Sequence, residues 1–276
     1  AFHRQGIYED IHNLEPAHFI LVNNKHEVSE QIQFAEVRRN MCGFDHEYFA
    51  HVTSIINGIS NQFYRREGGI ELSKLDEDVI FTFDDFLACV PETPRSIAHG
   101  YVEGCLRQGK NPPLPFEALI RDRHYRSFME DNPQNRIEKT RQKFLQTPGG
   151  LKGKVLWLIE DSIVRGDVGG GVIPMIREIL QPDKIHFRVA WSPYKHPCFR
   201  GIDTPDKVRL LAYRCQGNLE KMGQELQVDS LKFLSIETNR KLLAKHSGYG
   251  PEDFCMACTD GNYPTEFEKR LAGLND

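Results

Sequence analysis

The sequence lacks the apolar run of about 20 residues that a membrane-spanning helix requires. It also lacks a basic excess, because 39 Asp and Glu residues outnumber 35 Lys and Arg residues and the net charge is −4. These two absences argue against a membrane partner and against a nucleic-acid partner. The first residues, Ala1–Gln5, contain no apolar stretch of the kind that secretory signals carry, so we expect a cytoplasmic location.

The chain has seven cysteines, which is an odd number and leaves at least one without a disulfide partner within the chain. An odd count without a secretory signal argues against a disulfide framework and favours a reducing compartment. In such a compartment the spacing Cys255-x-x-Cys258 is typical of redox or metal chemistry. Cys89 and Cys105 lie within apolar patterns, which favours buried thiols at these two positions.

What the chain does have is an unbroken apolar run, Val155–Ile159, followed by the acidic pair Glu160-Asp161. Five apolar residues without alternation predict a strand that is buried on both faces, as in a parallel sheet. A glycine-rich segment follows, and then a predicted helix over 172–180, which accommodates Pro174 only in its first turn. This order places a site at the carboxyl edge of an open sheet.

The parts of this predicted site suit different groups of one ligand. A helix N-terminus offers free N–H groups to a phosphate. Glu160 and Asp161 would repel a phosphate, but they suit the hydroxyls of a sugar or a divalent cation beside it. The segment therefore predicts a site for a phosphorylated sugar. A solvated strand end or a helix cap is the more ordinary alternative for the two carboxylates.

Other apolar runs predict the rest of an α/β fold. We expect strands at 48–52, 85–90, 118–120, 184–190 and 231–234, and helices at 61–74, 94–106, 208–213, 219–226 and 240–245. A β-hairpin is expected within 19–34. Because strands alternate with helices, we predict an open, mostly parallel sheet with helices on both faces.

Two regions stand apart from this pattern. Residues 1–40 contain the hairpin, which is too small to bury a core alone. We expect it to pack on the main domain, 41–276, or to belong to a part of the protein that precedes it. The polar, basic segment 121–143 is long for a loop in a compact domain, which indicates a functional lid. For Arg136 and Lys139, within that segment, a solvated helix face is the simpler interpretation.

Several segments together resemble one enzyme family. The run Glu160–Gly166 resembles the phosphoribosyl pyrophosphate (PRPP) motif of type I phosphoribosyltransferases, and its Ser-Ile-Val-Arg-Gly wording resembles glutamine PRPP amidotransferases. Val90–Thr93 resembles their pyrophosphate loop, and Leu119–Arg123 with Arg141–Lys143 resembles the flexible loop that closes over PRPP. Several motifs in the right order make the resemblance specific. It implies the type I phosphoribosyltransferase fold, with residues 1–40 as the last strands of a glutaminase domain or a linker.

The resemblance also implies an iron–sulfur cluster. Family members that carry the cysteines hold a [4Fe–4S] cluster, and its ligands match Cys42, Cys198, Cys255 and Cys258. A cubane cluster requires four converging thiolates. A zinc ion at the same four positions, or four unrelated thiols, are the alternatives. In this family the cluster is structural and ties the C-terminal tail to the domain.

The reaction that the resemblance implies is displacement of pyrophosphate from C1 of PRPP by ammonia, which gives phosphoribosylamine for purine biosynthesis. Glu160 and Asp161 would hold the ribose hydroxyls and share Mg²⁺ with Thr93, and Glu92 would lie beside the pyrophosphate. Three arginines of the loop would neutralise the pyrophosphate once the loop closes, namely Arg121, Arg123 and Arg141. The 5′-phosphate would lie on the backbone of Ser162, Ile163, Val164, Arg165, Gly166, Asp167, Val168 and Gly169.

The sequence departs from the family pattern around the substrate. Asp167-Val168 stands where the family has two threonines that bind the 5′-phosphate, and a carboxylate there repels that group. His51-Val52-Thr53 replaces Arg-Pro-Asp, and Pro94 replaces a small residue. No glutaminase domain with its nucleophilic cysteine is present, so ammonia would come from a separate or missing part. The family forms homo-oligomers, and we expect one here. The alternatives are a catalytically impaired structural or regulatory partner and a transferase with an altered substrate.

Overall fold

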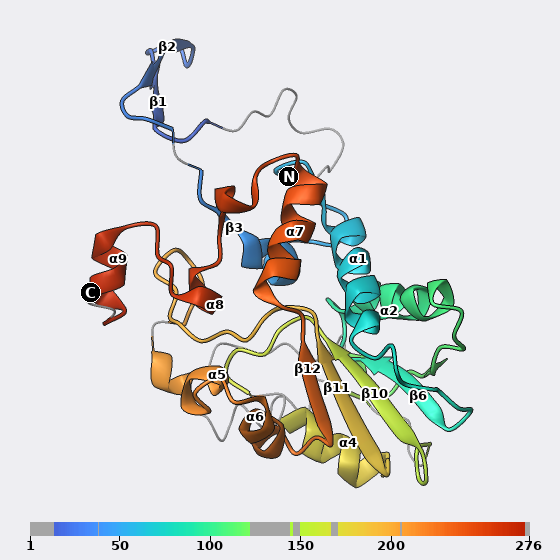
Figure 1. The fold of residues 1–276 in the computed structure, drawn as a ribbon. Helices are drawn as coiled ribbons and strands as arrows, with labels where there is room; N and C mark the ends of the chain where they lie inside the picture. Colours follow the sequence, from blue (N-terminus) through green and yellow to red (C-terminus); the bar gives the residue numbers. More distant parts are fainter. Residues whose placement is uncertain are drawn as a thin grey trace.

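The apolar run that follows Lys154 forms strand β10 (Val155–Glu160) at the centre of the fold. The computed structural model describes residues 14–37, 39–121, 144–145, 150–166, 171–204 and 206–273. In it, β10 is the middle strand of a five-stranded parallel sheet of order β12-β11-β10-β6-β7 (Figure 1). The other strands are β6 (Asp85–Cys89), β7 (Leu114–Pro115), β11 (Lys184–Val189) and β12 (Ser230–Phe233).

The alternation of side chains along β10 divides the core into two layers. Leu156 and Leu158 face one layer, which is covered by α4 (Ile173–Ile179), α5 (Leu211–Arg214) and α6 (Leu219–Leu226). Trp157 and Ile159 face the other, which is covered by α1 (Asn61–Lys74), α2 (Arg95–Arg107) and α7 (Ile236–Ser247). Both faces of the strand are therefore buried, as its unbroken apolar run predicts, and the expected open parallel sheet with helices on both faces is confirmed.

Helices α1 and α2 approach each other backbone to backbone. A Cβ at Gly69 would lie 1.9 Å from the carbonyl oxygen of Ile97, and one at Gly100 would lie 1.8 Å from that of Arg66. Only glycine fits at these two positions, because real Cβ atoms do not come so close to a backbone atom. The contact fixes the spacing of the two helices beside the sheet.

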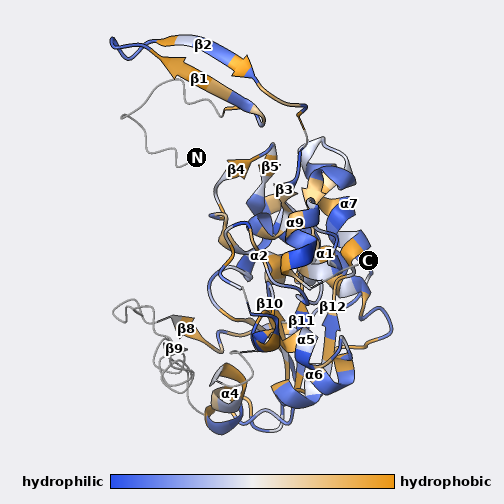
Figure 2. Cartoon of the chain, turned by 90° about the vertical axis from the view of Figure 1, so that its left-hand side faces the viewer, coloured by the Kyte–Doolittle hydropathy of each residue, from blue (hydrophilic) through white to orange (hydrophobic). Residues whose placement is uncertain are grey.

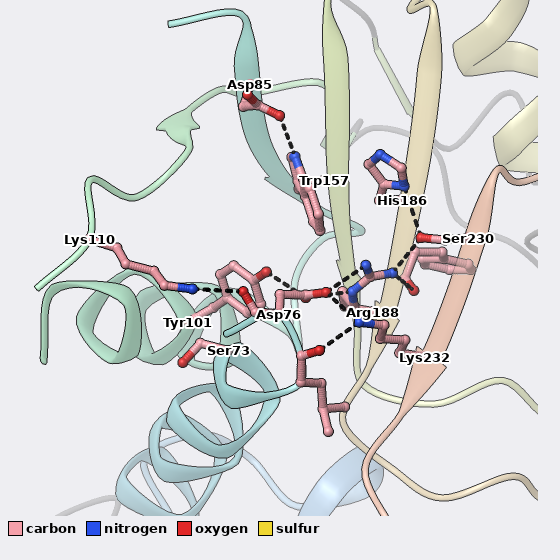
Figure 3. A network of polar contacts seen from close by, with 12 residues as sticks. Ser73, Asp76, Asp85, Tyr101, Lys110, Trp157, His186, Arg188, Ser230 and Lys232 are labelled. Atoms are coloured by element: carbon pink, nitrogen blue, oxygen red, sulfur yellow. Dashed lines mark hydrogen bonds and ion pairs between the residues drawn. The ribbon is translucent and has the colours of Figure 1, made fainter. Parts of the chain in front are cut away.

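A buried ion-pair network anchors α1 to the sheet from the turn that follows the helix (Figure 3). Asp76 accepts two hydrogen bonds from Arg188, at 2.7 Å from Nε and 2.8 Å from Nη2, and both side chains are almost completely buried. Tyr101 and Lys232 also donate to Asp76, at 2.8 and 2.9 Å. The Arg188 guanidinium lies 4.8 Å from the Trp157 ring centroid, so it also contacts the face of the central strand.

The predicted strand at 48–52 is wrong, because Asp45–Phe49 forms a short π-helical turn, η1. The reason is a buried arginine on α1. Arg65 donates from Nε to the carbonyl oxygen of His46 over 2.9 Å and from Nη2 to that of Ala50 over 2.7 Å. These carbonyl groups have their partner in a side chain that is distant in sequence, and the local apolar pattern carries no sign of it.

The predicted third strand at 118–120 is also wrong. Ala118 and Leu119 are buried core residues outside the sheet, whose edge strand is β7. Ile120–Arg121 (β8) instead pairs antiparallel with Phe144–Leu145 (β9) in a separate ribbon. The apolar run therefore reflects burial and not strand pairing, and these two origins look alike in a short run.

Two helix predictions need correction, while those at 61–74 and 219–226 are confirmed. The segment 208–213 divides into a 3₁₀ turn, η3 (Lys207–Arg209), and α5. The predicted helix at 240–245 is part of α7, which begins after Ser235 because its hydroxyl accepts the N–H of Thr238. Two further helices follow α7, namely α8 (Ala257–Asp260) and α9 (Glu266–Leu271).

Short elements complete the described chain. They are β3 (Met41–Cys42), β4 (Ile55–Ile56), β5 (Ile59–Ser60), the 3₁₀ turn η4 (Pro251–Asp253) and β13 (Phe254–Cys255). Strand β13 pairs in parallel with β3, which joins the C-terminal region to the start of the main domain. No helix in the part of the chain that is described is long and apolar enough to cross a membrane.

The predicted hairpin is present as β1 (His18–Val22) and β2 (Val28–Gln33), and it stands away from the main body (Figures 1 and 2). Figure 2 shows apolar residues along β1, and Phe19, Leu21 and Val28 keep 39%, 45% and 61% of their surface exposed. An isolated two-stranded hairpin has little stability of its own. The expected packing of this hairpin on the main domain is therefore not what the structure has.

Candidate functional site

The acidic pair predicted from the sequence lies at the carboxyl edge of the sheet, at the end of β10. Strands on both sides hold it, because the N–H of Val90 donates to the Ile159 carbonyl oxygen and the N–H of Ala190 to that of Glu160 (3.1 Å each). Glu160 and Asp161 are only 6% and 3% exposed. This burial is too complete for a solvated strand end, so that alternative does not describe the pair.

Burial sets the charge state of the two carboxyl groups. It raises the pKa of Glu160 well above its usual range, and the neighbouring charge of Asp161 raises it further. Burial also raises the pKa of Asp161, to about 6, although the Ser162 hydroxyl, the Arg65 charge and the Thr93 side chain all lower it. The Ser162 Oγ donates to Asp161 Oδ1 over 2.7 Å. Two adjacent buried carboxyl groups favour a cationic or hydrogen-bond-donating ligand between them.

The pyrophosphate-loop prediction places Thr93 beside this pair, and the Thr93 side chain lies close enough to Asp161 to lower the pKa of that carboxyl group. Glu92 is exposed next to it, before α2 begins at Arg95. The loop that holds Glu92 and Thr93 follows β6, and the pair follows β10, so both come from neighbouring parallel strands that end at one edge. Ligands of open α/β sheets bind at this edge.

The described part of the predicted phosphate loop runs from Ser162 to Gly166. Ser162 and Ile163 are buried, and the N–H of Leu211 donates to the Val164 carbonyl oxygen over 3.0 Å. Gly166 has a φ of +83°, a left-handed conformation that glycine adopts without strain. The Arg165 guanidinium hydrogen-bonds to the backbone of Asp203. The loop is thus tied to α5 and to the segment that precedes it.

Several predicted ligands lie outside the described residues. Asp167, Val168 and Gly169 are among them, as are Arg123 and Arg141 and the side chain of Arg121. Their roles therefore stay predictions.

Arg65 lies at this candidate site, and the sequence did not reveal it. It is 2% exposed, and its charge lowers the pKa of Asp161. Glu47 is also buried there, and its pKa is raised to about 8, chiefly by burial; Arg65 opposes this rise and Asp161 adds to it. Among the described residues, Glu47 Oε1 has no hydrogen-bond partner. The signal available in the sequence was the position of Arg65, a charged residue on the side of α1 that carries Tyr64 and Gly69 and faces the core.

The four predicted cluster cysteines line one cavity of about 270 Å³. Cys255 is the strand partner of Cys42 in the β13–β3 pair, and Cys258 follows on α8, while Cys198 reaches the cavity from the segment after β11. Within the described residues, however, no group of three or more His, Cys, Asp or Glu side chains is arranged to hold a single metal ion. The four thiols nevertheless share one cavity.

The chain is similar in sequence to amidophosphoribosyltransferases. The relative from Bacillus subtilis is 30% identical over 258 residues, which cover 93% of this chain and 51% of the relative. The relative from Pyrococcus horikoshii is 31% identical, with 92% and 52% covered, and the chloroplastic relative 1 from Arabidopsis thaliana is 30% identical, with 90% and 41% covered. The chain thus spans about half the length of these curated relatives. No protein-family model matches it.

Two solved structures have the same architecture. One is described as the allosteric regulatory enzyme of purine biosynthesis, and the other as glutamine PRPP amidotransferase from B. subtilis complexed with ADP and GMP. Both give a TM-score of 0.72 at 29% identity and cover 92% of this chain, against 52% and 53% of their own. The matched part is the transferase half.

Proposed function

We propose that this chain, homologous over nine-tenths of its length to the transferase half of amidophosphoribosyltransferases, transfers the phosphoribosyl group of PRPP to ammonia. The products are 5-phosphoribosylamine and pyrophosphate, and the process served is purine biosynthesis. The observation that carries the proposal is the buried pair Glu160-Asp161 at the carboxyl end of β10, with the side chain of Thr93 near Asp161 from the neighbouring strand's loop. A ribose with a magnesium-bound pyrophosphate matches these oxygen ligands.

The chain's own groups would act by positioning and by charge. Glu160 and Asp161 would accept hydrogen bonds from the ribose hydroxyls and stabilise the positive charge that develops at C1 as pyrophosphate leaves. The backbone from Ser162 onward would hold the 5′-phosphate. Closure of the predicted loop over the site would exclude water, which competes with ammonia for C1.

The residues fit a magnesium ion, because two adjacent carboxylates and a hydroxyl are hard oxygen ligands that leave room for phosphate oxygens. Glu160, Asp161 and Thr93 would hold it. When bound, Mg²⁺ neutralises charge on the pyrophosphate. Burial raises the pKa of both carboxyl groups, which favours their protonated forms. The positive charge of a bound dication would lower both pKa values again and favour the ionised forms.

The decisive experiment is an assay of pyrophosphate release from PRPP with free ammonia and Mg²⁺, on protein prepared without oxygen. We expect release that depends on all three components. If the chain neither releases pyrophosphate nor binds PRPP, the proposal is wrong, and the impaired partner is the better interpretation.

A second experiment distinguishes the proposed PRPP transferase from a transferase with an altered substrate. Replacing Asp167-Val168 by two threonines removes a carboxylate from the predicted phosphate loop, so PRPP affinity should rise if the 5′-phosphate binds there. Unchanged affinity would mean that this loop does not contact the 5′-phosphate.

The four cysteines fit a [4Fe–4S] cluster better than a zinc ion. A zinc site needs four ligands at about 2.3 Å from one point. Here the thiols of Cys42, Cys198, Cys255 and Cys258 line one cavity, and among the described residues no group of three or more His, Cys, Asp or Glu side chains is placed to hold a single metal ion. A cubane separates its four thiolates more widely, because each binds a different iron. The cluster would link β3 and β13 and would take no part in the transfer.

We expect anaerobically prepared protein to be brown and to contain about four iron atoms per chain. Cys255→Ser should lose most of the iron and unfold at a lower temperature. Cys215→Ser is the matched control, because this buried thiol lies outside the cavity and contacts Glu225. Zinc in place of iron, or an equal loss of iron from both variants, would contradict the cluster.

Ammonia from glutamine would need a glutaminase part, and we propose that residues 1–40 connect to it. The exposed apolar surface of β1 and β2 supports this, since such strands normally pair with or pack on others. We also propose that the chain assembles as a homo-oligomer.

A further inference from the structure

The cavity lined by the four cysteines also contains one pair of oppositely charged side chains. Among the described residues that line it, Arg200 is the only cation and Glu268 is the only carboxylate. Arg200 follows Cys198 by two residues, and Glu268 lies on α9. The proposed transfer reaction gives neither of these two residues a role.

The geometry of this pair is fixed. The Arg200 Nε donates to Glu268 Oε1 over 2.5 Å, and its Nη2 donates to Oε2 over 3.1 Å, which makes a two-point ion pair. Glu268 is almost completely buried and also accepts hydrogen bonds from the N–H and the hydroxyl of Thr265, at 3.1 and 2.7 Å. A guanidinium that is held at two points cannot easily turn away, so its charge stays at the wall of the cavity.

The backbone of Arg200 contacts a predicted cluster ligand directly, because its N–H donates to the Cys198 sulfur over 3.4 Å. Two hydroxyl groups of the cavity wall are engaged with other partners. The Tyr194 hydroxyl shares a hydrogen bond of 2.7 Å with the Thr204 hydroxyl, and the Tyr263 hydroxyl donates to a backbone carbonyl oxygen over 2.6 Å. Arg200 thus offers the cavity both an N–H donor and a positive charge.

An iron–sulfur cluster in this cavity would need such groups. The four thiolates of a [4Fe–4S] centre carry more negative charge than its core carries positive charge, so the bound cluster is an anion. Burying an anion is costly unless a counter-charge or hydrogen bonds stabilise it. Hydrogen bonds to the sulfurs and the charges nearby also determine how easily a cluster gains or loses an electron.

We propose that Arg200 stabilises the anionic cluster held by the four cysteines, through its guanidinium charge and through its N–H to the Cys198 sulfur. Glu268 fixes the position of the guanidinium and moderates its charge. The simpler alternative is that the pair only holds α9 against the segment that carries Cys198. The role of Arg200 rests on the proposed cluster and not on the proposed transferase activity.

The rate at which the cluster is lost in air distinguishes these two roles. Dioxygen takes one electron from the cluster and becomes superoxide, and the oxidised cluster then releases iron. Because this step makes the cluster less negative, a nearby cation opposes it and a nearby carboxylate favours it. In the full chain, prepared without oxygen, we expect Arg200→Gln to lose the visible absorbance of the cluster about tenfold faster than the parent chain. Glu268→Gln should lose it more slowly, and Arg200→Lys, which keeps the charge, should resemble the parent.

The opposite directions of the two glutamine variants are the decisive result. Faster loss from both would overturn the proposal, because weaker docking of α9 would expose the cavity in each. Lys207→Gln is the matched control, since the Lys207 Nζ donates to the Ala272 carbonyl oxygen just after α9 over 3.4 Å but does not line the cavity. Its rate should equal that of the parent, and an acceleration as large as that of Arg200→Gln would also overturn the proposal.

Iron analysis of the parent chain separates the role of Arg200 from the cluster itself. A parent chain without iron would refute the cluster, and the role of Arg200 with it. A parent chain with about four iron atoms, in which Arg200→Gln leaves the rate of loss unchanged, would refute only the role of Arg200.

Discussion

Asp161→Asn should lower the rate of pyrophosphate release by about 10²–10³-fold, the usual loss when one preorganised charge contact is removed from an active site. The reason is the environment of this carboxylate. It is buried, it accepts a hydrogen bond from Ser162, and the charge of Arg65 and the side chain of Thr93 both lower its pKa. Asparagine keeps the shape of the side chain but not its charge, and the neighbouring Arg65 is then less well balanced.

The control for this variant is Asp84→Asn. Asp84 is an exposed carboxylate that pairs with Lys154 at the opposite, amino end of β6 and β10. An exposed pair contributes roughly 0–1 kcal/mol to stability, and it touches no substrate, so release should be unchanged. Equal rates for Asp161→Asn and the parent chain would show that this carboxylate has no part in the reaction.

Asp76→Asn should destabilise the chain by about 3–5 kcal/mol, because it leaves the buried Arg188 without a counter-charge. Chemical denaturation at neutral pH measures this loss. Lys232→Met removes the more exposed cation of the same network, and we expect a loss of about 0–1 kcal/mol from it. A loss of similar size from both variants would contradict the assignment of Arg188 as the cation that depends on Asp76.

The same network predicts how this difference varies with pH. Burial alone would raise the pKa of Asp76, but the hydrogen bonds and charge of Arg188, with those of Lys232 and Tyr101, lower it below its ordinary value of 3.8. A carboxyl group with a lowered pKa stabilises the fold above that ordinary value, and the stabilisation is lost as pH falls further. The difference in free energy of unfolding between the parent chain and Asp76→Asn should therefore be largest near pH 7. It should become smaller as pH falls below about 4.

The central sheet and the acidic pair could be predicted from the sequence because their signals are local. Val155–Ile159 is apolar without a break, and two carboxylates and a glycine-rich turn follow it. This combination predicts a buried strand with a site at its carboxyl end. The length of α1 was predictable in the same way. The edge strand was not, because Leu114–Pro115 is too short to leave a pattern, while the longer apolar run 118–120 is buried without pairing.

The parts of the site that sequence reasoning missed depend on contacts between distant segments. In the sequence, Arg65 looks like an ordinary charged residue on a helix surface. Its role depends on η1, because Arg65 donates hydrogen bonds to the carbonyl oxygens of His46 and Ala50. The convergence of the four cysteines on one cavity is likewise invisible in their spacing, apart from the neighbours Cys255 and Cys258. Only the resemblance to a family predicted that Cys42 and Cys198 would join them.

The pairing of β3 with β13 has a consequence for how the chain is made. Met41–Cys42 emerges from the ribosome long before Phe254–Cys255, and the two strands can meet only after the segment up to Cys255 is out. Contacts between distant segments form late, because closing a long loop costs entropy before any contact forms. The strands of the sheet can therefore pair before the cysteine cavity closes, and a cluster of the proposed kind would be loaded only after Cys258 has been made.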